Sequence, residues 1–189
     1  MEEAVVREKT SATGSLKLKL APYEACVVVF GDMATAEWRT FRRARELKAE
    51  PLKTKPSFYV SLADSDDLGS FRPFLNTTKL VNITGKGYQV GFSGVIRYET
   101  TLELRESQTK GVLDLGAVGQ TARVWLNGKC VGFRVCPPYR FELKDFAKAG
   151  KNRLQIDVAN TLANKVRDHF SYFMQLTPSG LLGPITILS

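Results

Sequence analysis

Apolar and polar residues alternate in several short runs of this chain, and strict alternation is typical of half-buried strands. The longest such run covers 93–105, and a second one covers 153–158. In the first run charged residues and a threonine fill one face, and the other face carries Ile96, Tyr98, Thr100, Leu102 and Leu104. Each run therefore predicts a strand with one face towards a core and one towards water.

A hairpin is predicted where two further alternating runs are separated by Asn127-Gly128. This pair tolerates the positive φ angles of a type I′ turn, which matches the twist of paired strands. The apolar side chains, which we expect the rest of the chain to bury, are those of Val124, Leu126, Val131, Phe133 and Val135. After them, Pro137-Pro138 must end the strand or hold it at an edge.

Other segments complete an all-β prediction. Further strands are predicted at 16–20, 26–30, 58–60, 111–116 and 185–187, and a helix at 34–49. Pro51 and Pro56 mark a boundary. Short strands joined by turn-rich loops indicate an antiparallel β-sandwich at 51–189. Residues 1–50 are predicted to form a short strand-helix arm.

A family resemblance rests on the order of five segments: SGVIRYETTLEL, GVLDLGAVGQTARVWLNGKCVG, PPYRFEL, AGKNRLQIDVANTLAN and SGLLGPITI. In this order they resemble the sugar-binding-type domain of bacterial glycoside hydrolases of family 2 and of rhamnosidase-like enzymes. The resemblance covers about residues 90 to 189 and implies a galactose-binding-like jelly roll beside a catalytic barrel in a much longer chain. By the same resemblance, the arm at 1–50 looks like the end of a preceding β domain. The segment LANKVRDHFSYFMQL departs from it and matches no motif.

Composition allows one sizeable core and leaves a second function class open. The chain has 189 residues, 43% of them hydrophobic, and a net charge of +8 with a pI of about 9.5. A basic nucleic-acid-binding module is therefore the alternative function. Much of the charge is concentrated between Arg39 and Lys48, where a solvated helix face is favoured over a phosphate-binding stripe.

Cysteine usage and hydropathy bear on the compartment. Cys26, Cys130 and Cys136 form no even framework, so buried reduced thiols are expected. The chain shows neither a secretory signal nor an apolar run long enough for a bilayer. A cytoplasmic location without membrane association is favoured, unless the chain is an excerpt of a longer protein.

Catalytic and metal chemistry find little support in the sequence. Glycoside hydrolysis usually takes two convergent carboxyl groups, and no such pair is evident. His169 is the only histidine and has no ligands or triad partners at suitable spacing. The run 64–69 resembles a calcium loop only weakly, and a solvated loop is favoured. We therefore expect neither turnover nor a cofactor in the isolated chain.

Carbohydrate binding is the specific chemistry that remains. A sugar offers an apolar face to an aromatic ring and hydroxyls to polar side chains. The candidate residues are Trp125, Tyr139, Arg167, Asp168 and Tyr172. Each has an alternative: Trp125 could be core, Tyr139 could hold its loop through a hydrogen bond, and 167–172 could face an absent domain. The sequence thus predicts a noncatalytic accessory module that binds carbohydrate or buttresses a neighbouring catalytic domain, with buttressing slightly favoured.

Overall fold

The computed structural model describes residues 49–52, 56–166 and 173–189. The chain divides after Leu47, and every described residue belongs to the unit Lys48–Ser189. Several predicted features lie outside the described residues: the strands at 16–20 and 26–30, the helix at 34–49 except for its last residue, Cys26, and the basic cluster from Arg39 to Lys48. Ala49 itself opens a strand rather than closing a helix.

One layer of the fold is a six-stranded antiparallel sheet in the order β3-β2-β4-β10-β7-β8. Its strands are β2 (Phe58–Asp64), β3 (Arg72–Thr77), β4 (Gly94–Leu104), β7 (Thr121–Leu126), β8 (Lys129–Arg134) and β10 (Gly150–Ala159). All ten residues of β10 pair with β4, so these two long strands form the centre of the sheet.

The second layer consists of two smaller sheets. One has the order β1-β12-β5-β9, and the other pairs β11 with β6. Their strands are β1 (Ala49–Pro51), β5 (Val112–Asp114), β6 (Ala117–Gly119), β9 (Arg140–Glu142), β11 (Gly180–Gly183) and β12 (Thr186–Leu188). The 3₁₀ turns whose bounds lie within the described ranges are η1 (Glu106–Gln108) and η2 (Leu162–Asn164).

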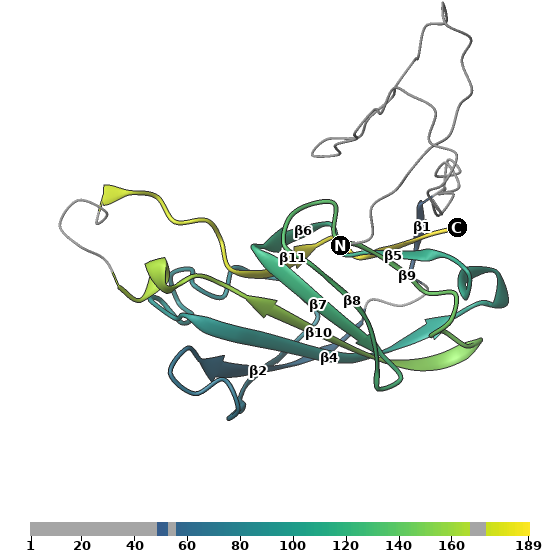
Figure 1. Cartoon of the computed structure of the whole chain (residues 1–189), viewed down its shortest axis with the longest axis horizontal. Helices are drawn as coiled ribbons and strands as arrows, with labels where there is room; N and C mark the ends of the chain where they lie inside the picture. Colours follow the sequence, from purple (N-terminus) through teal and green to yellow (C-terminus); the bar gives the residue numbers. More distant parts are fainter. Residues whose placement is uncertain (1–48, 53–55, 167–172) are drawn as a thin grey trace, which may run out of the picture. The chain divides into compact units, whose positions relative to one another are not determined.

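The core lies between the two layers, which face each other in Figure 1. A single apolar cluster joins Ile96, Val124 and Ile156 of the large sheet to Leu113 and Phe141 of the second layer. Alternation along β4 and β10 supplies the inner side chains, as the sequence pattern predicts. The all-β sandwich is thereby confirmed, while the N-terminal arm stays a prediction.

The Asn127-Gly128 turn forms as predicted, with φ angles of 53° and 81°. The Asn127 side chain also donates hydrogen bonds to the Phe146 carbonyl at 3.0 Å and to Asn152 Oδ1 at 2.9 Å, and accepts one from the Arg153 amide at 3.0 Å. Asn152 is fully buried. The hairpin turn is therefore tied to the turn that precedes β10.

The burial expected for the second hairpin strand is wrong for Phe133 and Val135, which are 59% and 65% exposed. A β-bulge lies in the β7–β8 pairing, so that Val124 faces Gly132 and Arg123 faces Phe133. Without the extra residue, Phe133 would point inwards with Ala122. A one-residue shift in a strand moves the following side chains to the opposite face. The bulge thus turns Phe133 to the outer face of the sheet.

The expectation of buried thiols is also wrong for the two described cysteines, since Cys130 and Cys136 are both exposed. Cys130 lies on β8, the edge strand of the large sheet, opposite Trp125. Cys136 follows the same strand. An edge strand has a neighbour on one side alone, so its outward side chains are covered less.

Tyr98 occupies the centre of the core with an exposed fraction of 1%. Its hydroxyl accepts a hydrogen bond from the Leu181 amide at 3.0 Å, which joins the large sheet to β11. Its ring meets that of Phe58 edge-on at 6.1 Å between centroids. Burial raises the pKa of this hydroxyl well above its ordinary value.

Replacing Asn127 by alanine is expected to lower the free energy of unfolding by about 2–4 kcal/mol, because the variant loses three hydrogen bonds and strains a positive φ. Urea unfolding measures this. Lys129→Ala in the same hairpin is the control, and we expect it to change stability by less than about 0.5 kcal/mol. Equal effects of the two substitutions would contradict the role given to Asn127.

Tyr98 is expected to make the fold sensitive to alkali. Below about pH 10 the hydroxyl is protonated in both states, whereas above it the unfolded chain alone loses the proton, so stability falls as pH rises, by up to about 1.4 kcal/mol per pH unit. Tyr98→Phe should lack this component, and the exposed Tyr59→Phe should retain it. Urea unfolding between pH 8 and 11 compares the slopes, and identical slopes for all three proteins would refute the assignment.

Candidate carbohydrate-binding surface

Two rows of polar and aromatic side chains lie on the side of the six-stranded sheet that points away from the core. We call this side the outer face. Directly paired residues of neighbouring strands lie on one side of a sheet, about 5 Å apart. The first row runs through Tyr59, Glu99, Gln155, Trp125 and Cys130, and the second runs through Ser61, Arg97, Asp157, Arg123 and Phe133. Alternation along the strands and the cross-strand register thus gather residues from five strands, and the β7–β8 bulge adds Phe133 to them.

Arg97 and Asp157 form the most enclosed ion pair of this face. Arg97 Nε and Nη2 donate to the two carboxylate oxygens of Asp157 at 2.8 and 2.7 Å. The ring of Phe71 covers the guanidinium at 3.7 Å. The hydrogen bonds to Asp157 raise the pKa of Arg97. A bidentate pair under an aromatic ring fixes both side chains, so this part of the face is rigid.

Trp125 lies half-buried towards the β8 end of the first row, between Gln155 and Cys130. The prediction that it points away from Val124 and Leu126 is confirmed, since those two are fully buried. The guanidinium of Arg123 lies over its ring at 5.1 Å. Further along the face, Arg153 donates to Glu99 at 2.7 Å. The tryptophan therefore stands among polar groups that could meet sugar hydroxyls.

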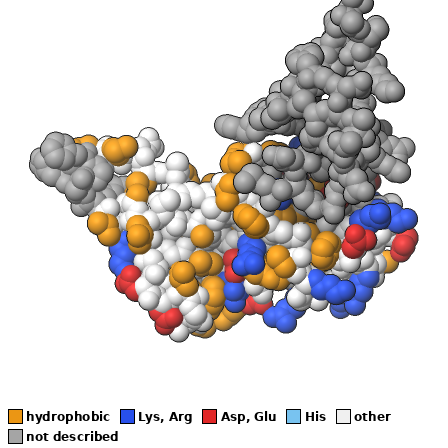
Figure 2. Space-filling view, in the orientation of Figure 1, with side chains coloured by type: hydrophobic (Ala, Val, Ile, Leu, Met, Phe, Trp, Pro, Cys, Tyr) orange, Lys and Arg blue, Asp and Glu red, His pale blue; other side chains and the backbone are white. Residues whose placement is uncertain are grey.

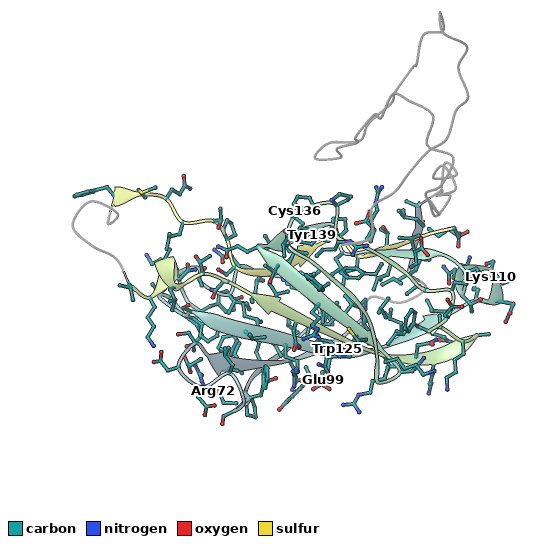
Figure 3. All side chains as sticks on the ribbon, in the orientation of Figure 1. Arg72, Glu99, Lys110, Trp125, Cys136 and Tyr139 are labelled. Carbon is teal, nitrogen blue, oxygen red and sulfur yellow. The ribbon has the colours of Figure 1, made fainter. Side chains whose placement is uncertain are left out.

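Tyr139 holds its loop through a hydrogen bond, which was the alternative to sugar binding. Its exposed fraction is 4%, and its hydroxyl donates to the backbone carbonyl of Gln120. Burial raises the pKa of that hydroxyl. Figure 3 shows Tyr139 close to Cys136 and well away from Glu99 and Trp125. Its ring offers no open face to a sugar, and the structure does not bring it together with Trp125.

The other candidates, Arg167, Asp168 and Tyr172, lie outside the described residues, as does His169. Their contribution to a binding site therefore stays a prediction.

Phe133 is an aromatic residue of the outer face that the sequence pattern placed in the core. Apolar periodicity assigned it to the core, and the bulge reverses that assignment. The available signal was Gly132, because a glycine within a strand often marks a bulge. Gly132 adopts a φ of 154°, which side chains rarely take.

A second exposed surface lies at one end of the sandwich. Asp64 pairs with Gly94, and Val95 with Ala159, so the loops beyond these residues share that end. Large apolar side chains are exposed in these loops, namely Leu68, Val90, Leu162, Val166 and Met174. We call this surface the loop end.

The loop end has a firmly held base. Asn160 donates to the Phe92 carbonyl and to Ser179 Oγ, and its own Oδ1 accepts from the Gly94 amide. Gln120 Nε2 donates to both Thr161 and Thr177 at 3.4 Å. The chain entering and leaving the segment after β10 is therefore fixed by long-range hydrogen bonds.

Carboxylates of the described residues are mostly engaged by cations. Besides the pairs already named, Asp114 accepts from Arg140 at 2.8 Å, and Lys165 pairs with Asp66. The hydrogen bond from Lys165 lowers the pKa of Asp66. Among the residues that the structure describes, no group of three His, Cys, Asp or Glu side chains could hold a metal ion. Within the same ranges, no helix has the length and apolar character to cross a membrane.

Figure 2 shows the surface as a mixture, with hydrophobic side chains in small groups between charged ones. On the outer face, Trp125 and Phe133 share one side of the sheet with the hydrogen-bonded arginine-carboxylate pairs described above. Such a combination suits binding of a polar, hydroxylated ligand better than a dry protein contact.

Comparison of the sequence with known proteins gives a partial match. No family model matches the chain. A protein of Formosa agariphila, named "Putative beta-glucuronidase", is 38% identical over 79 residues. The match covers 40% of this chain and 7% of that protein.

Solved structures match over most of the chain. A rhamnosidase from Novosphingobium sp. PP1Y is 25% identical with a TM-score of 0.62, covering 82% of this chain and 16% of the enzyme. A family 2 beta-galacturonidase from Eisenbergiella tayi, at 18% identity and a TM-score of 0.52, shares the fold over 79% of this chain and 25% of its own. The fold is therefore that of a β-sandwich domain of glycoside hydrolases.

The resemblance to the sugar-binding-type domain of family 2 and rhamnosidase-like glycoside hydrolases is confirmed by these matches. The chain spans less than a third of the length of each of these relatives. It corresponds to one domain of such an enzyme.

Replacing Asp157 by asparagine is expected to lower the free energy of unfolding by about 1–3 kcal/mol, because the partly covered Arg97 would keep its charge and lose its carboxylate. Glu99→Gln is the matched control, since its partner Arg153 is 74% exposed, and exposed pairs contribute about 0–1 kcal/mol. Thermal or urea unfolding measures both. A larger loss for Glu99→Gln would overturn this ranking.

Proposed function

We propose that this chain acts as a noncatalytic accessory domain of a glycoside hydrolase and that its outer face contacts carbohydrate. The observation that carries the proposal is the match of this one sandwich to 16% of a rhamnosidase chain. A domain of this size leaves the larger part of such an enzyme, including a barrel of about 250 residues, to the rest of the polypeptide.

The contact with carbohydrate is supported by the chemistry of the outer face. Trp125 lies beside Gln155 and near the ion pair of Glu99 with Arg153. Aromatic rings bind the apolar face of a pyranose, and polar groups in fixed positions orient its hydroxyls. Because Arg97, Asp157 and Phe71 hold one another, the face would lose little conformational entropy on binding.

The noncatalytic role is supported by the hydrogen bonds that the acidic side chains accept. Hydrolysis of a glycosidic bond usually takes a general acid together with a second carboxylate at about 5–9 Å. In the described ranges, Asp157, Glu99 and Asp114 each accept hydrogen bonds from an arginine, so a guanidinium already occupies part of each of these carboxylates.

Buttressing of the catalytic domain is the second candidate role, and the loop end favours it. Val90, Leu162 and Val166 are 73%, 57% and 69% exposed on loops whose base is held by Asn160 and Gln120. Exposed apolar side chains in a fixed arrangement are typical of a contact surface. For the parent enzyme we propose a glycosidase, and the name of the Formosa protein makes a β-glucuronide a substrate to test there.

Glycan-array binding tests the proposal. We expect the wild-type chain to bind at least one class of glycan. Trp125→Ala should weaken that binding by about tenfold or more, because a ring stacked on an aromatic side chain contributes about 1–3 kcal/mol where this has been measured for nucleic-acid bases. Tyr88→Ala, which removes an exposed aromatic ring from the loop end, is the matched control and should bind as the wild type does.

Two further outcomes separate the possible roles. Hydrolysis of aryl glycosides above a blank would reject the noncatalytic role. Failure of the wild-type chain to bind any glycan would reject carbohydrate capture and leave the buttressing role, which is then tested by adding the separately produced catalytic domain.

A further inference from the structure

The outer face has an imbalance between its arginines and their carboxylates. Arg97 is neutralised by Asp157, and Arg153 is paired with Glu99. Arg123 is the cross-strand neighbour of Asp157, yet both oxygens of that carboxylate already accept from Arg97. Among the described ion pairs none includes Arg123, so an exposed guanidinium keeps an uncompensated charge there.

Two aromatic residues are neighbours of Arg123 on the outer face. The ring of Trp125 lies below it, at 5.1 Å from the guanidinium carbon. Phe133 is the direct partner of Arg123 on β8 and is 59% exposed. Because the β7–β8 bulge brings Phe133 to this side, the edge of the sheet presents a cation over one aromatic ring, with a second aromatic residue as its direct cross-strand neighbour.

This combination fits a carboxylated sugar better than a neutral one. A uronic acid residue has an apolar ring face, which packs on an aromatic side chain, and a planar carboxylate, which matches the forked geometry of a guanidinium. A neutral pyranose would pack on the aromatic rings but would leave the charge of Arg123 unpaired. Phosphate chains of a nucleic acid usually meet several cations, and this part of the outer face offers one unpaired arginine.

We propose that Arg123, Trp125 and Phe133 form a subsite for a uronic acid residue of a glycan. The subsite lies on the β7–β8 edge, with the carboxylate bound by Arg123 and the sugar ring packed against Phe133 and the open part of Trp125. This inference rests on the proposed carbohydrate contact and adds to it the charge class of the ligand.

Calorimetric titration of the whole chain tests the subsite with a matched pair of probes. The first probe is a trisaccharide of galacturonic acid, and the second is the same trisaccharide with its carboxyl groups reduced to hydroxymethyl groups. We expect the acidic probe to bind at least tenfold more tightly, with an affinity that falls as salt is raised, since the carboxylate contact is electrostatic.

Three variants assign the preference to the residues. Arg123→Gln should remove the preference for the acidic probe, and Arg123→Lys should restore it in part, because a lysine keeps the charge without the fork. Arg140→Gln is the control: Arg140 is an exposed arginine of the second layer whose charge is already paired with Asp114, and its loss should change the affinity by less than twofold. Thermal unfolding verifies that each variant is folded.

The outcomes keep this inference separate from the proposed function. Equal binding of both probes, or an unchanged preference in Arg123→Gln, would overturn the uronate subsite while carbohydrate binding stands. Binding of neither probe would overturn the subsite. The accessory role would then be decided by the glycan array and by the test with the catalytic domain. Tighter binding of single-stranded DNA than of the acidic probe, with a steep salt dependence, would replace the sugar by a nucleic acid.

Discussion

The antiparallel pairing of β4 with β10 is the constraint on which the rest of the structure depends. Every residue of β10 is paired with one of β4, without a bulge in the ladder. Since side chains alternate across a strand, this continuous register sends Ile96, Tyr98 and Ile156 into the core and Arg97 and Asp157 outwards. The polar outer face is thus the necessary counterpart of the apolar core.

The β7–β8 hairpin departs from that regularity, and its departure shapes the outer face. The extra residue of β8 leaves Val124 in the core and turns Phe133 outwards next to Arg123. A bulge at a sheet edge costs some pairing, yet such bulges commonly redirect a side chain. Here the redirected side chain is aromatic and stands beside an arginine without a carboxylate, which is an arrangement that burial of the core does not require.

The two exposed surfaces differ in kind: one suits a small polar ligand, and the other suits a protein surface. The outer face is built on strands and stiffened by the Arg97–Asp157 pair, whereas the loop end is apolar and held at its base by Asn160 and Gln120. A site on strands keeps a fixed geometry, as recognition of a small ligand needs. Exposed apolar loops suit contact with a protein surface.

Much of the fold follows from local sequence. The alternation in 93–105 and 153–158 determined which side chains of β4 and β10 enter the core, and Asn127-Gly128 determined the turn, because both signals depend on neighbours a few residues away. The position of Trp125 on the outer face follows in the same way. The neighbours of Trp125 on that face do not follow from local sequence, since Gln155 lies on a strand that is distant in the chain.

What the tertiary structure alone decided is how distant residues meet. Arg97 and Asp157 are 60 residues apart in sequence, and their pairing is what leaves Arg123 unneutralised. Packing in the core buries Tyr139. The β7–β8 bulge turns Phe133 outwards, and Cys130 is exposed on an edge strand. Sequence periodicity records which side chains avoid water, but charge pairing and register shifts depend on which strands become neighbours.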